Sequence, residues 1–123
     1  MKGEVDQTMG VGMSESSNDY ACDAGARDFT ATAYRNSKGE RWVTVEGTCA
    51  CNTEGFELTL ELASPPIVPV PEELHLNLVE HAPDGSVPQV ITATPVKEDF
   101  LIGDEAERVV IRNRHVTVPI KKE

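Results

Sequence analysis

The chain has 123 residues, which is enough for one domain with a hydrophobic core of its own. Hydrophobic residues make up 39% of it and charged residues 26%, which excludes a fully disordered protein. The 21 acidic residues against 11 basic ones give a formal net charge of −10. Because phosphate groups are bound through Lys and Arg, this balance argues against nucleic acid and anionic membranes as partners. It favours a soluble protein, or one with a basic partner.

The sequence contains no sign of a membrane span or a secretory signal. No window reaches the roughly 18 consecutive apolar residues that a span requires, and residues 1–9 lack an apolar block. The three cysteines, Cys22, Cys49 and Cys51, leave at least one thiol unpaired. We therefore expect a reducing compartment and a cytoplasmic protein.

Residues 1–26 are rich in Gly, Ser, Asp, Glu and Asn and follow no hydrophobic period. This composition predicts a flexible acidic tail, because too little apolar surface is present to offset the entropy of ordering. The folded domain is expected over residues 27–123.

Three segments at the start of this domain alternate apolar and polar residues, as half-buried strands do. They cover residues 28–35, 41–50 and 55–63, and residues 36–39 and 52–55 connect them. Short polar loops with glycine favour hairpins, so an antiparallel meander is expected. In the middle segment Val43 and Val45 mark the core face, while Gly47 on that face indicates a bulge or a close approach of backbones.

Residues 64–71 contain four prolines and separate this part from the rest. Proline removes ladder donors and stiffens the chain, so the segment is expected to cross from one sheet to another. Further short strands are predicted at residues 74–81, 87–95, 100–102, 108–112 and 115–120. Pro119 indicates that the last of these is an edge strand.

No amphipathic helical period persists over three turns, whereas seven or eight short strands recur at intervals of about 8–12 residues. The sequence thus predicts an all-β protein, an antiparallel β-sandwich of immunoglobulin-like shape. The order Cys22, Trp42, Cys49 imitates the Cys, Trp and Cys of immunoglobulin domains, but the interval is too short.

Cys49 and Cys51 form the strongest chemical feature, because residues two apart in a strand share a face. Three interpretations are open. The thiols are inert and buried, since Cys49 continues the face of Val43 and Val45, or a disulfide such as Cys22 to Cys51 forms. Alternatively the pair binds a soft metal or works in redox chemistry, although the paired CxxC spacings of zinc sites are absent. We expect inert thiols, with no metal and no cofactor.

The histidines and the loop carboxylates are interpreted as surface groups. His75 and His81 lie on the outer face of one predicted strand, too far apart to share a metal, and His115 is expected at a strand end. The carboxylates around the short strand at 100–102 could bind Ca²⁺, but a solvated acidic loop is expected because no EF-hand spacing is present. They are Glu98, Asp99, Asp104, Glu105 and Glu107.

No nucleophile elbow, phosphate-binding glycine loop or HExxH helix is present, so an enzyme is not expected. By elimination, the sequence favours a non-catalytic module that recognises another protein with a basic surface. The binding face is predicted at Trp42, Thr44 and Glu46, which point away from the core face, with the indole as anchor. Two alternatives are a metal-binding or redox protein that uses Cys49 and Cys51, and an acidic inhibitor that imitates nucleic acid.

Overall fold

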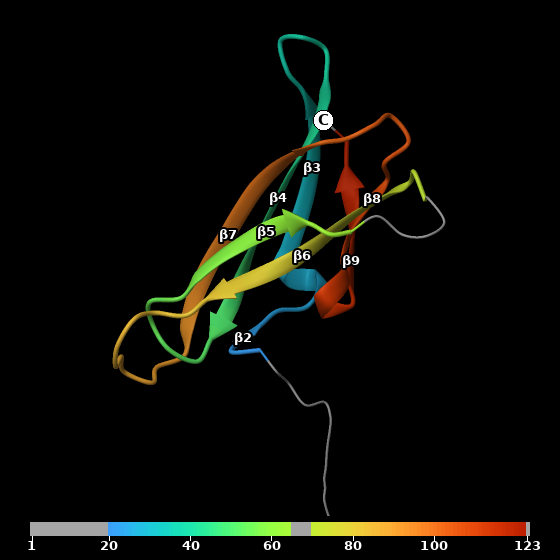
Figure 1. Cartoon of the computed structure of the whole chain (residues 1–123). Helices are drawn as coiled ribbons and strands as arrows, with labels where there is room; N and C mark the ends of the chain where they lie inside the picture. The colour runs from blue at the N-terminus through green and yellow to red at the C-terminus, as the bar shows by residue number, and fades with distance from the viewer. Residues whose placement is uncertain (1–19, 65–69, 123) are drawn as a thin grey trace, which may run out of the picture.

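The computed structural model describes residues 20–64 and 70–122. This part of the chain is built of strands and two short 3-10 helices, which confirms the all-β class (Figure 1). The strands are β2 (Cys22–Asp23), β3 (Phe29–Arg35), β4 (Arg41–Cys51), β5 (Glu57–Leu62), β6 (Glu73–His81), β7 (Thr92–Leu101), β8 (Arg108–Ile111) and β9 (Val116–Lys121). The 3-10 helices are η1 (Ala26–Asp28), before β3, and η2 (Arg112–Arg114), before β9.

The alternation read from the sequence decides which side chains are buried. In β4, Val43, Val45 and Cys49 are fully buried, and the residues between them are not. Leu60 on β5 and Leu76 on β6 belong to the same core. This one cluster contains residues of all eight strands, so both halves of the domain share a hydrophobic interior.

The strands form one path of hydrogen-bonded neighbours in the order β2-β4-β3-β9-β8-β6-β5, and β7 pairs with the other side of β4. The path is not closed. Strands β5 and β7 lie next to each other without a ladder between them, as Figure 1 shows in green and brown. Each therefore has one hydrogen-bonded neighbour within the described residues.

An entirely antiparallel arrangement was predicted, and this is wrong at two places. Strand β3 pairs with β9 in parallel, and β6 pairs with β8 in parallel. Parallel neighbours need a long connection, and both pairs join strands that lie far apart in the sequence. The result is a mixed sheet.

The predicted meander ends after its first hairpin. Strands β3 and β4 pair antiparallel as expected, but β5 pairs with β6 instead of β4. Strand β4 has no free side, because β3 and β2 occupy one side and β7 occupies the other. The proline-containing segment thus connects two antiparallel neighbours and does not cross between sheets; its residues 65–69 lie outside the described part of the chain.

Strand β7 replaces two predicted strands. It runs without interruption through the charged residues 97–99, and residues 87–91 do not belong to a strand. Its inward side chains include Val96 and Phe100, and Pro95 is tolerated because β4 is the only ladder partner of β7 in the described residues. Pro119 does not mark an edge, since β9 lies between β8 and β3; pairing with β3 begins at Ile120, just after the proline.

Two residues that follow the core-face alternation, Gly47 and Leu62, have different surroundings in the structure. Gly47 marks a close approach, as predicted: it faces Phe29, and an added Cβ would come within 2.4 Å of that ring. Leu62 continues the alternation of Leu58 and Leu60, yet it is 67% exposed because it is the last residue of β5, outside the core cluster. No helix in the described part of the chain has the length and apolarity to cross a membrane.

Candidate functional site

The outer face of β4, together with its neighbours β3 and β7, carries the residues that were predicted to bind a partner. The antiparallel register aligns the outward side chains in rows across the three strands. These rows are Tyr34, Trp42 and Leu101, then Thr32, Thr44 and Asp99, then Thr30, Glu46 and Lys97. We call this surface, with Thr48, Ala50, Ala93 and Pro95 farther along the same strands, the β4 outer face.

The row at one end of this face is aromatic and aliphatic. Trp42 is partly buried between Tyr34 and Leu101, and the leucine is 56% exposed. Among the described residues, the indole Nε1 of Trp42 is a buried donor without a hydrogen-bond acceptor. A buried donor in this state costs free energy.

The middle row is fixed by Asp99. Its carboxylate accepts a hydrogen bond of 2.7 Å from the hydroxyl of Thr44 and one of 3.1 Å from the phenol of Tyr34. Burial, and then the bond to and the charge of Asp99, raise the pKa of Tyr34 above its usual value. The phenol therefore stays a neutral donor, and its hydrogen bond ties Tyr34 to the middle row.

At the other end the side chains on the β4 outer face are small, and the surface is hollowed. Ala50 of β4 lies opposite Ala93 of β7, so two methyl groups stand where larger side chains would fill the space. The first hollow has a volume of about 400 Å³ and is lined by Asp23, Asp28, Thr48, Cys49, Ala50, Ile91 and Ala93. The second hollow, of about 320 Å³, adjoins it and is lined by Arg27, Asp28, Thr30, Glu46, Gly47, Thr48, Pro95, Val96 and Lys97.

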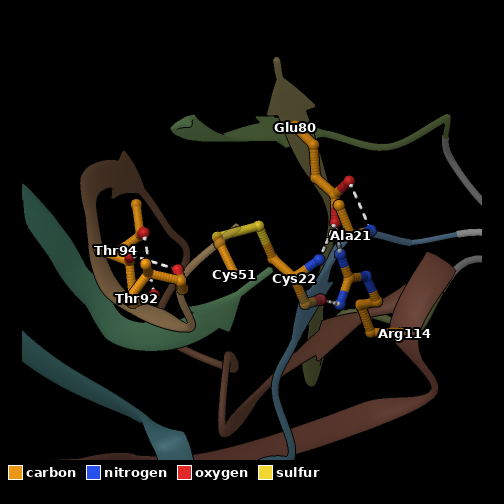
Figure 2. Close-up of a disulfide and its surroundings, with 8 residues drawn as sticks. Ala21, Cys22, Cys51, Glu80, Thr92, Thr94 and Arg114 are labelled. Atoms are coloured by element: carbon orange, nitrogen blue, oxygen red, sulfur yellow. Dashed lines mark hydrogen bonds and ion pairs between the residues drawn. A yellow bond between two sulfur atoms is a disulfide. The ribbon is translucent and has the colours of Figure 1, made fainter. Parts of the chain in front are cut away.

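A disulfide positions one wall of the first hollow. Cys22 and Cys51 face each other in the register of β2 and β4 and are bonded, as Figure 2 shows. The structure thus selects the second of the three cysteine interpretations for this pair, and Cys49 is the one free thiol. A disulfide is more typical of oxidising compartments, so the odd cysteine count does not by itself indicate a reducing one.

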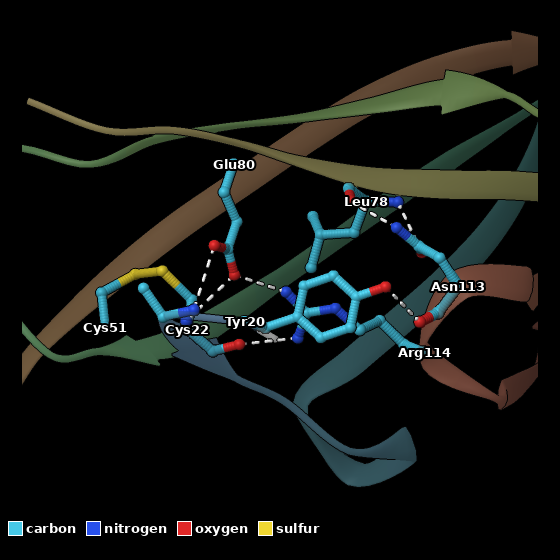
Figure 3. A network of polar contacts seen from close by, with 8 residues as sticks. Tyr20, Cys22, Cys51, Leu78, Glu80, Asn113 and Arg114 are labelled. Atoms are coloured by element: carbon cyan, nitrogen blue, oxygen red, sulfur yellow. Dashed lines mark hydrogen bonds and ion pairs between the residues drawn. A yellow bond between two sulfur atoms is a disulfide. The ribbon is translucent and has the colours of Figure 1, made fainter. Parts of the chain in front are cut away.

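A buried ion pair holds the same strand. Glu80 accepts hydrogen bonds from the backbone N–H groups of Ala21 and Cys22, and Arg114 donates to the carbonyl of Cys22 and to Glu80, both at 2.6 Å. The side chains of Arg114 and Glu80 are 6% and 15% exposed, and the ring of Tyr20 covers the guanidinium at 3.8 Å (Figure 3).

Residues 20–26 were assigned to the flexible tail, but residues 20–23 are tied to the domain. The rest of the predicted tail, residues 1–19, lies outside the described residues.

The free thiol of Cys49 is poorly suited to redox or metal chemistry. Burial raises its pKa, the charge of Arg114 lowers it, and the charges of Asp28 and Glu80 raise it again. A neutral thiol is a weak nucleophile and a weak ligand. The predicted alternative needs both Cys49 and Cys51, and the disulfide occupies Cys51.

His75 is not the surface histidine that was expected. Its Nε2 lies 2.8 Å from Glu73, and Arg112 donates to its Nδ1 at 2.9 Å, which places the ring proton on Nε2. Glu73 also accepts a hydrogen bond from Arg108, and the bonds from His75 and Arg108 lower the pKa of this carboxyl. The network joins β6 to β8 at the start of their parallel ladder. His81 is exposed, as predicted, and so is His115.

The loop carboxylates are not gathered into a site. Asp99 belongs to the middle row, Asp104 forms an exposed ion pair with Arg35 at 3.0 Å, and Glu107 lies 3.9 Å from Arg108. Within residues 20–64 and 70–122, no group of three or more His, Cys, Asp or Glu residues could hold a metal ion.

Sequence reasoning placed Trp42 on the outer face but missed its neighbours Tyr34 and Leu101 and the first hollow. Asp23 and Asp28 lie next to the boundary assigned to the tail, and Ala93 is distant from both in the sequence. The small residues Ala50 and Ala93 were the available signal, but only the pairing of β4 with β7 brings them together. Comparisons with models of protein families, with curated proteins and with solved structures found no match.

Proposed function

We propose that the protein is a non-catalytic module that binds another protein through the β4 outer face. The observation that carries this proposal is the row of Tyr34, Trp42 and Leu101 on an ordered sheet surface. Aromatic side chains supply a large contact area at a low entropy cost and dominate the energy of many interfaces. Leu101 is exposed beside them and extends the apolar patch.

We further infer that the strands form a two-layered β-sandwich of immunoglobulin-like shape. One layer would hold β2, β3, β4 and β7 and the other β5, β6, β8 and β9, with the short parallel pairing of β3 and β9 joining them along one side. The shared core cluster, with valines of the first layer and leucines of the second, supports this arrangement. In this geometry the β4 outer face points away from the core and is free for recognition.

The partner is expected to present a basic surface. With a net charge of −10, the protein attracts cationic surfaces over distances of about one Debye length, ~8 Å at physiological salt. Such attraction accelerates encounter more than it tightens the final complex. The disulfide between Cys22 and Cys51 supports a compartment that is oxidising, so the partner is sought there.

The test compares two variants, Trp42→Ala and Leu62→Ala, in which a large apolar side chain is replaced by alanine. Partners captured from the native host at low and moderate salt are identified, and their affinity for Trp42→Ala is measured against the unchanged protein. Removing an anchor should weaken binding by about 2 kcal/mol, roughly thirtyfold, while circular dichroism stays that of a folded β protein. Leu62→Ala is the matched control, since Leu62 is 67% exposed on β5, outside the β4 outer face.

Two results would overturn the proposal. If Trp42→Ala unfolds the domain, the indole belongs to the core; if it binds as the unchanged protein does, the face is elsewhere. Binding that disappears steeply with salt but ignores Trp42 would instead support an acidic inhibitor that imitates nucleic acid.

A further inference from the structure

We propose that the turn after β6 is a site of spontaneous covalent modification, at which Asp84 converts to isoaspartate. The inference is independent of the proposed binding function, because the turn does not belong to the β4 outer face. Of the seven aspartates in the sequence, only Asp84 is followed by a glycine. The pair lies in the connection from β6 to β7, at the lower left of Figure 1.

Gly85 leaves its main-chain nitrogen accessible to the side chain that precedes it. Other residues shield this nitrogen with their own Cβ, which glycine lacks. Gly85 is exposed and has a φ of 76°, and an added Cβ would meet no atom outside the neighbouring residues within 4 Å. Among the described residues no acceptor binds its N–H group, so no hydrogen bond holds the proton on this nitrogen.

The carboxylate of Asp84 is free to turn toward this nitrogen. Asp28, Asp99 and Asp104 are held in place, by a backbone N–H, a hydroxyl and a guanidinium respectively. Asp84 is exposed, and within the described residues its carboxylate has neither a hydrogen bond nor an ion pair. An open glycine nitrogen and an unrestrained carboxylate thus adjoin each other in an exposed connection, where backbone mobility is greatest.

The reaction needs no reagent except water. The nitrogen of Gly85 attacks the carboxyl carbon Cγ of protonated Asp84. The N–Cγ bond forms, the bond from Cγ to the hydroxyl breaks, and the hydroxyl leaves as water with the proton of the nitrogen. Water then opens the cyclic imide: breaking the new N–Cγ bond restores aspartate, and breaking the bond from the nitrogen to the main-chain carbonyl carbon gives isoaspartate. The water lost is regained, and no atom is oxidised or reduced.

Isoaspartate changes the path of the chain where the turn packs on its neighbour. The main chain then runs through Cβ and Cγ of residue 84, which lengthens it by one methylene group. The preceding Pro83 packs closely on the turn before β5, since a Cβ added to Gly55 would lie 2.8 Å from the Cβ of Pro83. A longer chain disturbs this contact, so the modified protein should unfold at a lower urea concentration than fresh protein.

The experiment follows the full, folded chain during incubation at neutral pH and physiological temperature. Samples are denatured, reduced and digested with a protease that cleaves before aspartate but not before isoaspartate. The fraction that resists cleavage before residue 84 should rise with time, while cleavage before Asp99 in the same chain stays complete. Methyl transfer by an enzyme specific for isoaspartate gives a second readout. In water enriched in heavy oxygen the product should gain one heavy oxygen atom, because solvent opens the imide.

Two variants at the same position separate this chemistry from the shape of the turn. Asp84→Glu keeps the charge and Gly85 but does not form the same imide, so the methyl label should be lost. Asp84→Asn forms the same imide with ammonia as the leaving group, which departs more readily than hydroxide, so the label should appear faster than in the unchanged protein. Both substitutions are at an exposed position, and circular dichroism verifies that both variants are folded.

The chain unfolded in urea, with its disulfide reduced, shows whether the folded turn permits the reaction. Label on the folded chain that depends on Asp84 supports the proposal. The proposal is overturned if the folded chain stays unlabelled while the unfolded chain is labelled, because the turn then holds the two groups apart. It is also overturned if neither chain is labelled, or if Asp84→Glu is labelled as strongly as the unchanged protein.

Discussion

At the scale of single residues, Arg114 and Glu80 form the least exposed ion pair of the described residues. Charges that are 6% and 15% exposed have lost much of their hydration, so each depends on the other. Glu80 in addition serves two backbone N–H groups of the N-terminal strand. Removing one partner leaves the other buried and uncompensated, which is why a buried pair is costly to break even where it adds little net stability.

We therefore expect Arg114→Leu to lower the free energy of unfolding by about 3 kcal/mol in urea denaturation at neutral pH. The double variant with Glu80→Gln should lose less than the two single losses together, because no unpaired charge is left. Arg35→Ala provides the matched exposed case: its pair with Asp104 has side chains 50% and 81% exposed and should contribute about 1 kcal/mol or less. Equal losses for Arg114→Leu and Arg35→Ala would contradict this account.

At the scale of elements, β2 is the strand whose position depends most on bonds other than its own ladder. It has two residues, too few for a ladder to hold, and its position depends on the disulfide to the end of β4. The two cysteines are 29 residues apart in the sequence. A link over such a loop restricts the unfolded chain, and the restriction raises the stability of the folded state.

Replacing Cys22 and Cys51 together by Ala should lower the free energy of unfolding by about 3 to 4 kcal/mol, as the loop length implies. Cys49→Ala, which keeps the bond and loses only a small buried thiol, is the control and should cost less. Titration with a thiol reagent under non-reducing conditions should find one thiol per chain, reacting slowly until the protein is denatured. Three reactive thiols would disprove the disulfide.

At the scale of the whole molecule, Glu73 links the stability of the fold to pH. Its bonds to His75 and Arg108 lower the pKa of Glu73 in the folded state. A carboxyl of this kind stabilises the fold fully above its ordinary pKa of 4.5, and the contribution is lost as the pH falls through the lowered value. The protein should thus become less stable in acid partly through this one group.

Glu73→Gln should be less stable than the unchanged protein at neutral pH, and the difference should shrink as the pH falls below the ordinary pKa of the carboxyl. Urea midpoints measured from neutral pH down to about pH 3 test this. Glu54→Gln, in the exposed turn after β4, controls for general loss of negative charge. A difference between Glu73→Gln and the unchanged protein that is constant with pH would show that Glu73 acts by packing alone.

The extent of what could be read from the sequence is clearest at β4 and β5. Alternation with a period of two indicates which side chains share a face. The apolar side chains of Val43 and Val45 then indicate which face points inward. Trp42 was accordingly predicted to point outward. The same pattern does not identify which strand lies beside another. The sequence therefore predicted that β5 pairs with β4, although it pairs with β6. Pairing depends on which edges are still free, and that is a property of the whole sheet.

By itself the sequence determined the all-β class, the core faces of most strands and the outward position of Trp42, because these follow from local periodicity and hydrophobicity. Only the tertiary structure decided the two parallel pairings, the bond between Cys22 and Cys51, and the hollow between Asp23 and Ala93. Each of these joins residues that are distant along the chain. Their proximity results from strand order and register, which no local pattern encodes.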